Sequence, residues 1–215
     1  MSVGHPDPGW RSVAPGIAVR EAGADPQSST PTRLFLEQCP PAGSGQRVFG
    51  DGSHPTTRLC AGAVSSLCSV QRPQAVLDVG TGTGLLARIA RACGATYIVG
   101  TDIDPAALRV AAANAALDAG APVDILLSDA APDAWGARFD LVVANILESP
   151  LMTLAPALAA ALRPGGVLLL SGFTGSQAPR LRVHYEALGL KPVREATLEG
   201  WVLLMLARPR PAGVS

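Results

Sequence analysis

The sequence predicts an α/β fold in which a seven-stranded, mostly parallel sheet carries helices on both faces. Short apolar runs and helical patterns alternate between residues 74 and 190, which is typical of parallel strands joined by helices. The expected strands are continuous apolar runs, as they are where both faces of a sheet are covered. With 215 residues, 48% of them hydrophobic, the chain is long enough for one domain with a full core.

The sequence pattern predicts the bounds of each strand and helix of this fold. The seven strands are expected at residues 74–79, 97–101, 123–127, 141–144, 167–170, 192–196 and 201–207. The last two have no helix between them, so we expect an antiparallel pair with an antiparallel edge strand. Helices are expected at residues 55–67, 85–93, 105–116, 151–162 and 176–188. Gly94 ends one helix, and Asp104 followed by Pro105 caps the start of the next.

The first 45 residues differ in composition from the rest. They are rich in proline, glycine, serine and glutamine and predict a loosely structured arm that packs on a domain formed by residues 46–215. Within the arm, Gly16 to Arg20 and Arg33 to Glu37 alternate well enough for short strands.

The overall charge excludes some classes of function. Lysine and arginine number 17, as do aspartate and glutamate, so the formal net charge is zero. Such a chain has no basic field to attract phosphates, which argues against DNA or RNA as the main partner. No apolar run reaches the roughly 18 residues that span a bilayer, and the first ten residues lack a signal-peptide core. A cytoplasmic location is therefore expected.

The four cysteines, Cys39, Cys60, Cys68 and Cys93, show no metal-binding pattern. None forms a C-x-x-C pair, and no histidine lies at zinc-ligand spacing. We expect reduced, mostly buried thiols and no metal site.

A glycine-rich loop, Asp78 to Gly84, follows the first strand of the sheet. Ligands of open parallel sheets bind at the carboxyl ends of the strands. Gly80, Gly82 and Gly84 would let the backbone turn tightly and a ligand approach. The dinucleotide fingerprint needs its third glycine where Leu85 stands, which disfavours a nicotinamide-dependent oxidoreductase. The G-x-G-x-G form resembles the S-adenosylmethionine (SAM) loop of class I methyltransferases; an ordinary tight turn is the alternative.

Acidic residues end the second and third strands. Asp102 lies 22 positions beyond Gly80, where a carboxylate can accept both ribose hydroxyls of a nucleoside cofactor. A helix-capping acid is the alternative, which Asp104 fits better. Asp129 could accept the adenine amino group, or it could be a loop acid that starts a turn.

Asn145 follows the apolar fourth strand, beside the switch point of the sheet. Its amide could bind the amino-acid part of SAM or hold the nucleophile. The alternative is an asparagine that caps the following helix.

The chain resembles one methyltransferase family. Phe49 to Arg58, FGDGSHPTTR, is similar to the F-G-T-G-x-H-P-T-T segment of bacterial PrmA methyltransferases, although Asp51 replaces a threonine. Further matching segments are DVGTGTG, GTDIDP, VVANILESPL, LSG and EGWV. The resemblance covers roughly residues 46 to 207, and its HPTT and NIL segments are more specific than the glycine loop.

This resemblance implies a Rossmann-like class I methyltransferase that uses SAM. PrmA enzymes modify a large-subunit ribosomal protein at lysine side chains and an N-terminal amine. The resemblance also implies cofactor roles for Thr57, Gly80, Asp102 and Asn145, and a Phe49 segment that folds over SAM.

Other interpretations of the segment around residue 50 start from the residues alone. They make Thr56 or Thr57 a helix N-cap and His54 a loop residue without a role. For methyl transfer, positioning and exclusion of water supply most of the rate. We therefore expect Asn145 and nearby carbonyls to orient a neutral amine. Glu148, Asp51 and His54 are candidate proton acceptors, none of them favoured.

The substrate has two alternatives. Only 48 residues precede Phe49, and they look too rich in proline to form the N-terminal domain with which PrmA holds its protein substrate. A methyltransferase for an amino acid or natural product is therefore the second hypothesis. The third is a SAM-binding module without catalysis, which the intact glycine loop, Asp102 and Asn145 disfavour.

Overall fold

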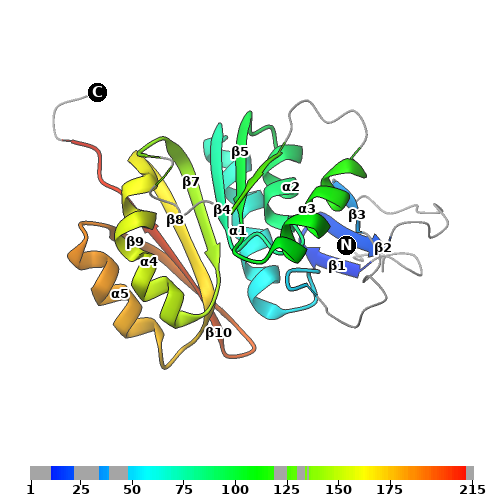
Figure 1. Ribbon diagram of the computed structural model, residues 1–215. Coiled ribbons are helices and arrows are strands. Elements are labelled where there is room, and N and C mark those ends of the chain that lie inside the picture. Colours follow the sequence, from blue (N-terminus) through cyan, green and yellow to red (C-terminus); the bar gives the residue numbers. More distant parts are fainter. Residues whose placement is uncertain are drawn as a thin grey trace.

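The computed structural model describes residues 11–21, 34–38, 48–118, 125–129, 134 and 136–211. A seven-stranded sheet with strand order β6-β5-β4-β7-β8-β10-β9 runs through the molecule (Figure 1). Its parallel strands are β4 (Ala75–Val79), β5 (Tyr97–Thr101), β6 (Ile125–Ser128), β7 (Phe139–Asn145) and β8 (Leu162–Thr174). Antiparallel pairing joins β8 to β10 (Trp201–Ala207) and β10 to the edge strand β9 (Lys191–Leu198). The predicted α/β fold and its antiparallel edge are confirmed.

Helices cover both faces of this sheet. They are α1 (Pro55–Gln71), α2 (Leu85–Ala92), α3 (Pro105–Ala116), α4 (Glu148–Ala161) and α5 (Ala178–Ala187). Two hydrophobic clusters lie on opposite faces, one formed with α1 and α2 and the other with α4 and α5. Neighbouring residues of one strand enter different clusters: Val76 packs in the first and Leu77 in the second. This arrangement explains why the strands are apolar at every position.

Element boundaries differ from the predictions by a few residues. The helix predicted to end at Leu67 continues to Gln71, and α4 begins at Glu148 instead of Leu151. Strand β8 extends well beyond residues 167–170 at both ends. These extensions consist largely of polar or exposed residues, which carry no apolar pattern.

The N-terminal part of the chain contributes a second sheet. It consists of β1 (Arg11–Ala14), β2 (Ile17–Glu21) and β3 (Leu34–Gln38) in that order, with β2 and β3 parallel. The two predicted strands are confirmed, whereas β1, with only four residues before a Pro-Gly turn, was not expected. Val13 and Ile17 pack in the same cluster as α1. The described part of the arm is thus a packed sheet and not a loose segment; the domain division at residue 45 stays a prediction.

Two remaining expectations concern cysteines and membranes. Cys60, Cys68 and Cys93 have free thiols, and the first two are buried; Cys39 lies outside the described residues. Among the residues that the structure describes, no helix has the length and apolarity to cross a membrane.

Candidate active site

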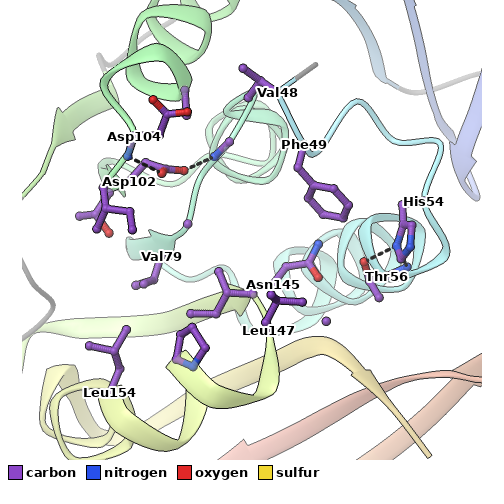
Figure 2. A pocket seen from close by; sticks show the side chains of 18 of the residues that line it. Val48, Phe49, His54, Thr56, Val79, Asp102, Asp104, Asn145, Leu147 and Leu154 are labelled. Atoms are coloured by element: carbon purple, nitrogen blue, oxygen red, sulfur yellow. Dashed lines mark hydrogen bonds between the residues drawn. The ribbon is translucent and has the colours of Figure 1, made fainter. Parts of the chain in front are cut away.

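A cavity of about 740 Å³ opens at the carboxyl ends of β4, β5 and β7. It brings together Phe49, Gly80, Gly82, Asp102, Asp129 and Asn145 from the predicted set. In Figure 2, Asp102 and Asp104 lie on one side of it, and Phe49, His54 and Asn145 on the other. Two predicted residues, Thr57 and Gly84, are not among the residues that line it.

The glycine loop takes a path that side chains would block. Gly80 and Gly82 have φ angles of +70° and +55°, a region that favours glycine. A Cβ on Gly80 would lie 2.3 Å from Cγ2 of Ile146, and one on Gly82 would lie 2.2 Å from the Phe49 carbonyl oxygen. The loop therefore approaches both walls of the cavity through bare backbone.

Gly84 acts behind the loop. It is the N-cap of α2 with a φ of +78°, and a Cβ there would lie 3.2 Å from Cβ of Ala111. Its small size lets α2 and α3 approach each other, which is a packing role away from the cavity wall.

Asp102 connects the end of β5 to this loop. One carboxylate oxygen accepts the Gly82 N–H at 3.0 Å, and the other accepts the Asp104 N–H at 3.0 Å. A carboxylate has about four acceptor sites, so Asp102 keeps acceptor capacity toward the cavity that it lines. Asp104 accepts the Ala106 N–H at 2.8 Å and caps α3, as predicted.

Asn145 lines the cavity, and its side-chain amide is satisfied only in part. Its side-chain nitrogen donates to the Thr57 hydroxyl at 3.5 Å, while its buried Oδ1 has no hydrogen-bond partner in the described structure. A buried acceptor without a partner is costly unless a ligand satisfies it. The N-cap of α4 is Leu147, so the capping alternative for Asn145 is wrong.

Asp78 lies beneath the loop and is fully buried. Burial raises the pKa of its carboxyl to about 6, against a hydrogen bond from the Thr81 hydroxyl, which lowers it. That bond is 2.7 Å long, and the other carboxylate oxygen has no partner in the described structure. Burial thus destabilises the carboxylate beneath the loop, and hydrogen bonding to Thr81 and to the Ala87 backbone opposes this effect.

The segment of residues 48–54, here called the cavity loop, forms one wall with aromatic rings. The Phe49 ring lies 5.2 Å from the His54 ring, which meets Trp201 edge-on at 4.7 Å. His54 Nδ1 accepts the Thr56 N–H at 3.3 Å and caps α1. The predicted threonine cap is thus wrong, and His54 has a role. The signal was present, because His54 precedes Pro55 as Asp104 precedes Pro105.

Two of the three candidate proton acceptors are engaged by other side chains. Glu148 accepts from the Gln177 side chain at 2.8 Å, and the Asp51 carboxylate accepts from the Ser53 hydroxyl at 2.6 Å. Neither residue lines the cavity, whereas His54 does.

Apolar residues complete the cavity and were not singled out from the sequence. Ile103 and Leu147 line it although they are 94% and 69% exposed, and Trp201 reaches it from β10. Large apolar residues directly after Asp102 and Asn145 were the available signal, because strand ends in such sheets face the ligand.

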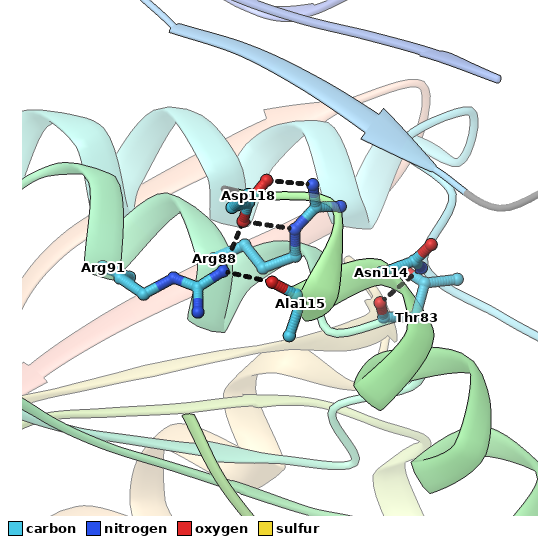
Figure 3. A network of polar contacts seen from close by, with 6 residues as sticks. All are labelled: Thr83, Arg88, Arg91, Asn114, Ala115 and Asp118. Carbon is cyan, nitrogen blue, oxygen red and sulfur yellow. Dashed lines mark hydrogen bonds and ion pairs between the residues drawn. The ribbon is translucent and has the colours of Figure 1, made fainter. Parts of the chain in front are cut away.

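A polar network lies behind the glycine loop (Figure 3). The buried Asn114 donates from its side chain to the Thr83 carbonyl at 2.8 Å. Arg88, fully buried, makes two hydrogen bonds to Asp118, of 2.8 Å and 2.5 Å, and Arg91 binds the same carboxylate. Burial alone would raise the pKa of Asp118. The two guanidinium groups lower it by more than burial raises it, so the pKa lies below its usual value. The network fixes the end of α3 to α2.

The strand order of this sheet, the glycine loop after β4 and the acid after β5 are those of the methyltransferase fold. Residues 46–209 match the family model of the ribosomal protein L11 methyltransferase (PrmA), and the chain belongs to this family. The family resemblance seen in the sequence is confirmed.

Known relatives agree with this assignment. The ribosomal protein L11 methyltransferase of Bradyrhizobium diazoefficiens is 43% identical over 165 residues, which are 75% of this chain and 56% of that protein. That of Burkholderia lata is 43% identical over 175 residues, 81% of this chain and 54% of its own length. The chain thus spans about half the length of the curated relatives it matches.

A solved structure has the same fold over nearly the whole chain. The ribosomal protein L11 methylase of Lactobacillus delbrueckii subsp. bulgaricus superposes with a TM-score of 0.81 at 28% identity. The match covers 94% of this chain and all of that one.

Proposed function

We propose that this protein is a SAM-dependent methyltransferase that modifies an amine of a protein, with ribosomal protein L11 as the substrate. The observation that carries the proposal is the meeting of Asp102 and the partly satisfied Asn145 amide in one cavity beside the glycine loop. The names of the relatives support the substrate. Such a substrate would place the reaction in the cytoplasm.

The residues of the cavity fit the cofactor. Asp102 would accept the ribose hydroxyls, the bare backbone of Gly80 and Gly82 would admit the nucleoside, and the Asn145 Oδ1 would accept from the amino-acid part. Asp129, exposed at the cavity edge, would accept from the adenine amino group. When bound, SAM supplies an electrophilic methyl group on its sulfonium.

Other residues act through these. Thr57 is buried and contacts Asn145, so its proposed cofactor role is to orient that amide. Gly84 supports the loop by packing against α3. Phe49 covers the cavity from the side of the cavity loop.

The apolar wall prepares the acceptor amine. Only a neutral amine has the lone pair that attacks, and apolar surroundings lower the pKa of an entering ammonium group by desolvation. The aromatic rings of Phe49, His54 and Trp201 supply such surroundings and exclude water. Asn145 would then hold the amine in line.

Among the residues that the structure describes, the three candidate proton acceptors offer no dedicated base. Asp51 and Glu148 are engaged elsewhere. His54 Nδ1 accepts from Thr56, so the neutral ring carries its proton on Nε2 and is a donor at that atom. We propose that the amine loses its proton to water before it is enclosed.

A transfer assay tests the proposal. Purified protein is incubated with methyl-labelled SAM and either purified L11 or cell extract, and macromolecules are separated from small solutes. Label in L11, with the modified amines located by mass spectrometry, is the expected result. Label only in small solutes would replace the protein substrate by a metabolite, and no label in any fraction would contradict the enzyme assignment.

A further inference from the structure

Three successive carbonyl groups of the cavity loop are held from two sides. The Phe49 carbonyl accepts the Thr83 N–H at 3.1 Å, and the Gly50 carbonyl accepts the Thr83 hydroxyl at 2.7 Å. The Asp51 carbonyl accepts from the N-terminal sheet, at 2.5 Å from Arg11 Nη2 and 3.3 Å from Gln38 Nε2. The glycine loop thus binds one end of the segment and strands β1 and β3 bind the next residue.

Packing reinforces the second attachment. A Cβ on Gly52 would lie 2.7 Å from Cγ2 of Val13, so β1 lies directly against the cavity loop. Gln38 is only 6% exposed, and a buried side-chain amide needs hydrogen-bond partners. Arg11 also lies 3.7 Å from the Asp51 carboxylate.

We propose that the N-terminal sheet is a clamp that holds Phe49 over the cofactor cavity, with Arg11 and Gln38 as its positioning residues. The proposal rests on the proposed function, because it assigns to the clamp the affinity for SAM. Neither residue lines the cavity. Both act through the backbone of Asp51, two residues from the Phe49 ring.

The effect on SAM affinity depends on how well the cavity loop is ordered before SAM binds. A clamped loop is already arranged for the ligand, whereas a released loop must be ordered by binding, which reduces affinity. Loss of the two side-chain bonds should raise the Kd for SAM about tenfold. The maximal rate should change by less than about twofold, because the saturated enzyme has the same wall.

The test compares two double variants. Arg11→Met with Gln38→Met removes the donors of the clamp but keeps most of the side-chain volume. The control is Arg208→Met with Gln74→Met, because these side chains also donate to backbone carbonyls, those of Leu162 and Arg72. Both control residues lie at the opposite end of the sheet from the cavity.

Calorimetric titration with SAM and hydrogen exchange of residues 48–54 are the measurements. We expect weaker binding and faster exchange of these amides in the clamp variant alone. Arg11→Lys keeps a donor and should retain most of the affinity. If the double variant fails to fold, Arg11→Met and Arg11→Lys are compared instead, because the Arg11 side chain is 44% exposed and its replacement leaves the core intact. Equal SAM affinity in the clamp and control variants would overturn the proposal.

The experiment distinguishes failure of the proposed function from failure of the clamp. If the unmodified protein binds no SAM, that function is lost, and exchange alone decides whether the clamp exists. Exchange of residues 48–54 that is the same in the clamp variant and the unmodified protein would refute it.

Discussion

The Asp102 carboxylate accepts the Gly82 N–H at 3.0 Å and so joins the end of β5 to the middle of the glycine loop. Its other oxygen binds the Asp104 N–H at the start of α3. One side chain therefore fixes two backbone segments that line the cavity. The same charge faces the place where we put the ribose of SAM.

Asp102→Asn is expected to weaken SAM binding. The amide keeps one oxygen acceptor but loses the charge, and hydrogen bonds to charged groups are roughly twice as strong as neutral ones. We predict an increase in the Kd for SAM of about 10- to 100-fold, measured by calorimetry. Asp104→Asn, at a neighbouring residue that also lines the cavity and can still cap α3, should change the Kd for SAM less, by about threefold at most.

Asn145→Ala is expected to abolish turnover and to reduce SAM affinity, since it removes the buried acceptor of the cavity. Thr57→Val removes only the hydroxyl that contacts this amide, so a smaller loss, of about tenfold in kcat/KM, should result. Steady-state kinetics with labelled SAM measures both variants. Unchanged affinity and turnover in Asn145→Ala would remove this residue from the site.

Gly82→Ala should displace the cavity loop, because the new Cβ would lie 2.2 Å from the Phe49 carbonyl oxygen. We expect loss of SAM binding and a fall in stability of about 1 to 3 kcal/mol. Gly62→Ala in α1 is the matched control, because its Cβ would lie 3.7 Å from that of Ala14. The control should gain about 0.5 to 1 kcal/mol. Urea unfolding gives both values, and an unaffected Gly82→Ala would contradict the close approach.

Asp118→Ala should destabilise the protein strongly, because it leaves the buried Arg88 without its counter-ion. A loss of about 3 to 5 kcal/mol is typical of such a change. The lowered pKa of Asp118 gives the pH dependence: the carboxylate stabilises the folded state above its unfolded pKa of about 3.9, and this stability is lost as the pH falls through the folded pKa. Urea unfolding of the unmodified protein and of Asp118→Ala between about pH 7 and pH 3 checks this. The prediction is contradicted if the difference in their free energies of unfolding does not shrink toward acid pH.

Asp78→Asn should have the opposite effect. Burial raises the pKa of this carboxyl to about 6, so the folded state loses stability as the pH rises from about 4 to about 6. The amide of the variant removes the buried charge, which favours the folded state, although its N–H groups need new acceptors. We expect the first effect to be larger, with a gain in the free energy of unfolding of about 1 to 3 kcal/mol at neutral pH. The gain should vanish in thermal unfolding below about pH 4. A variant less stable at neutral pH would show that the charge is compensated.

The sequence predicted most of the fold because strand patterning and glycine spacing are local. Asp102 and Asn145 could be assigned to the cavity because strand ends in a parallel sheet must meet. The capping role of His54 was missed because Ser and Thr dominate such caps. The contacts of Gln38 and Arg11 with Asp51 could not be predicted, because they join segments 13 and 40 positions apart whose sequences show no shared pattern.

Cofactor binding is the central claim, and titration calorimetry tests it most directly. Purified protein is titrated with SAM and, separately, with NADH. We predict saturable binding of one SAM per chain and no heat from NADH. Binding of NADH without SAM, or of neither, would contradict the assignment of this cavity to SAM.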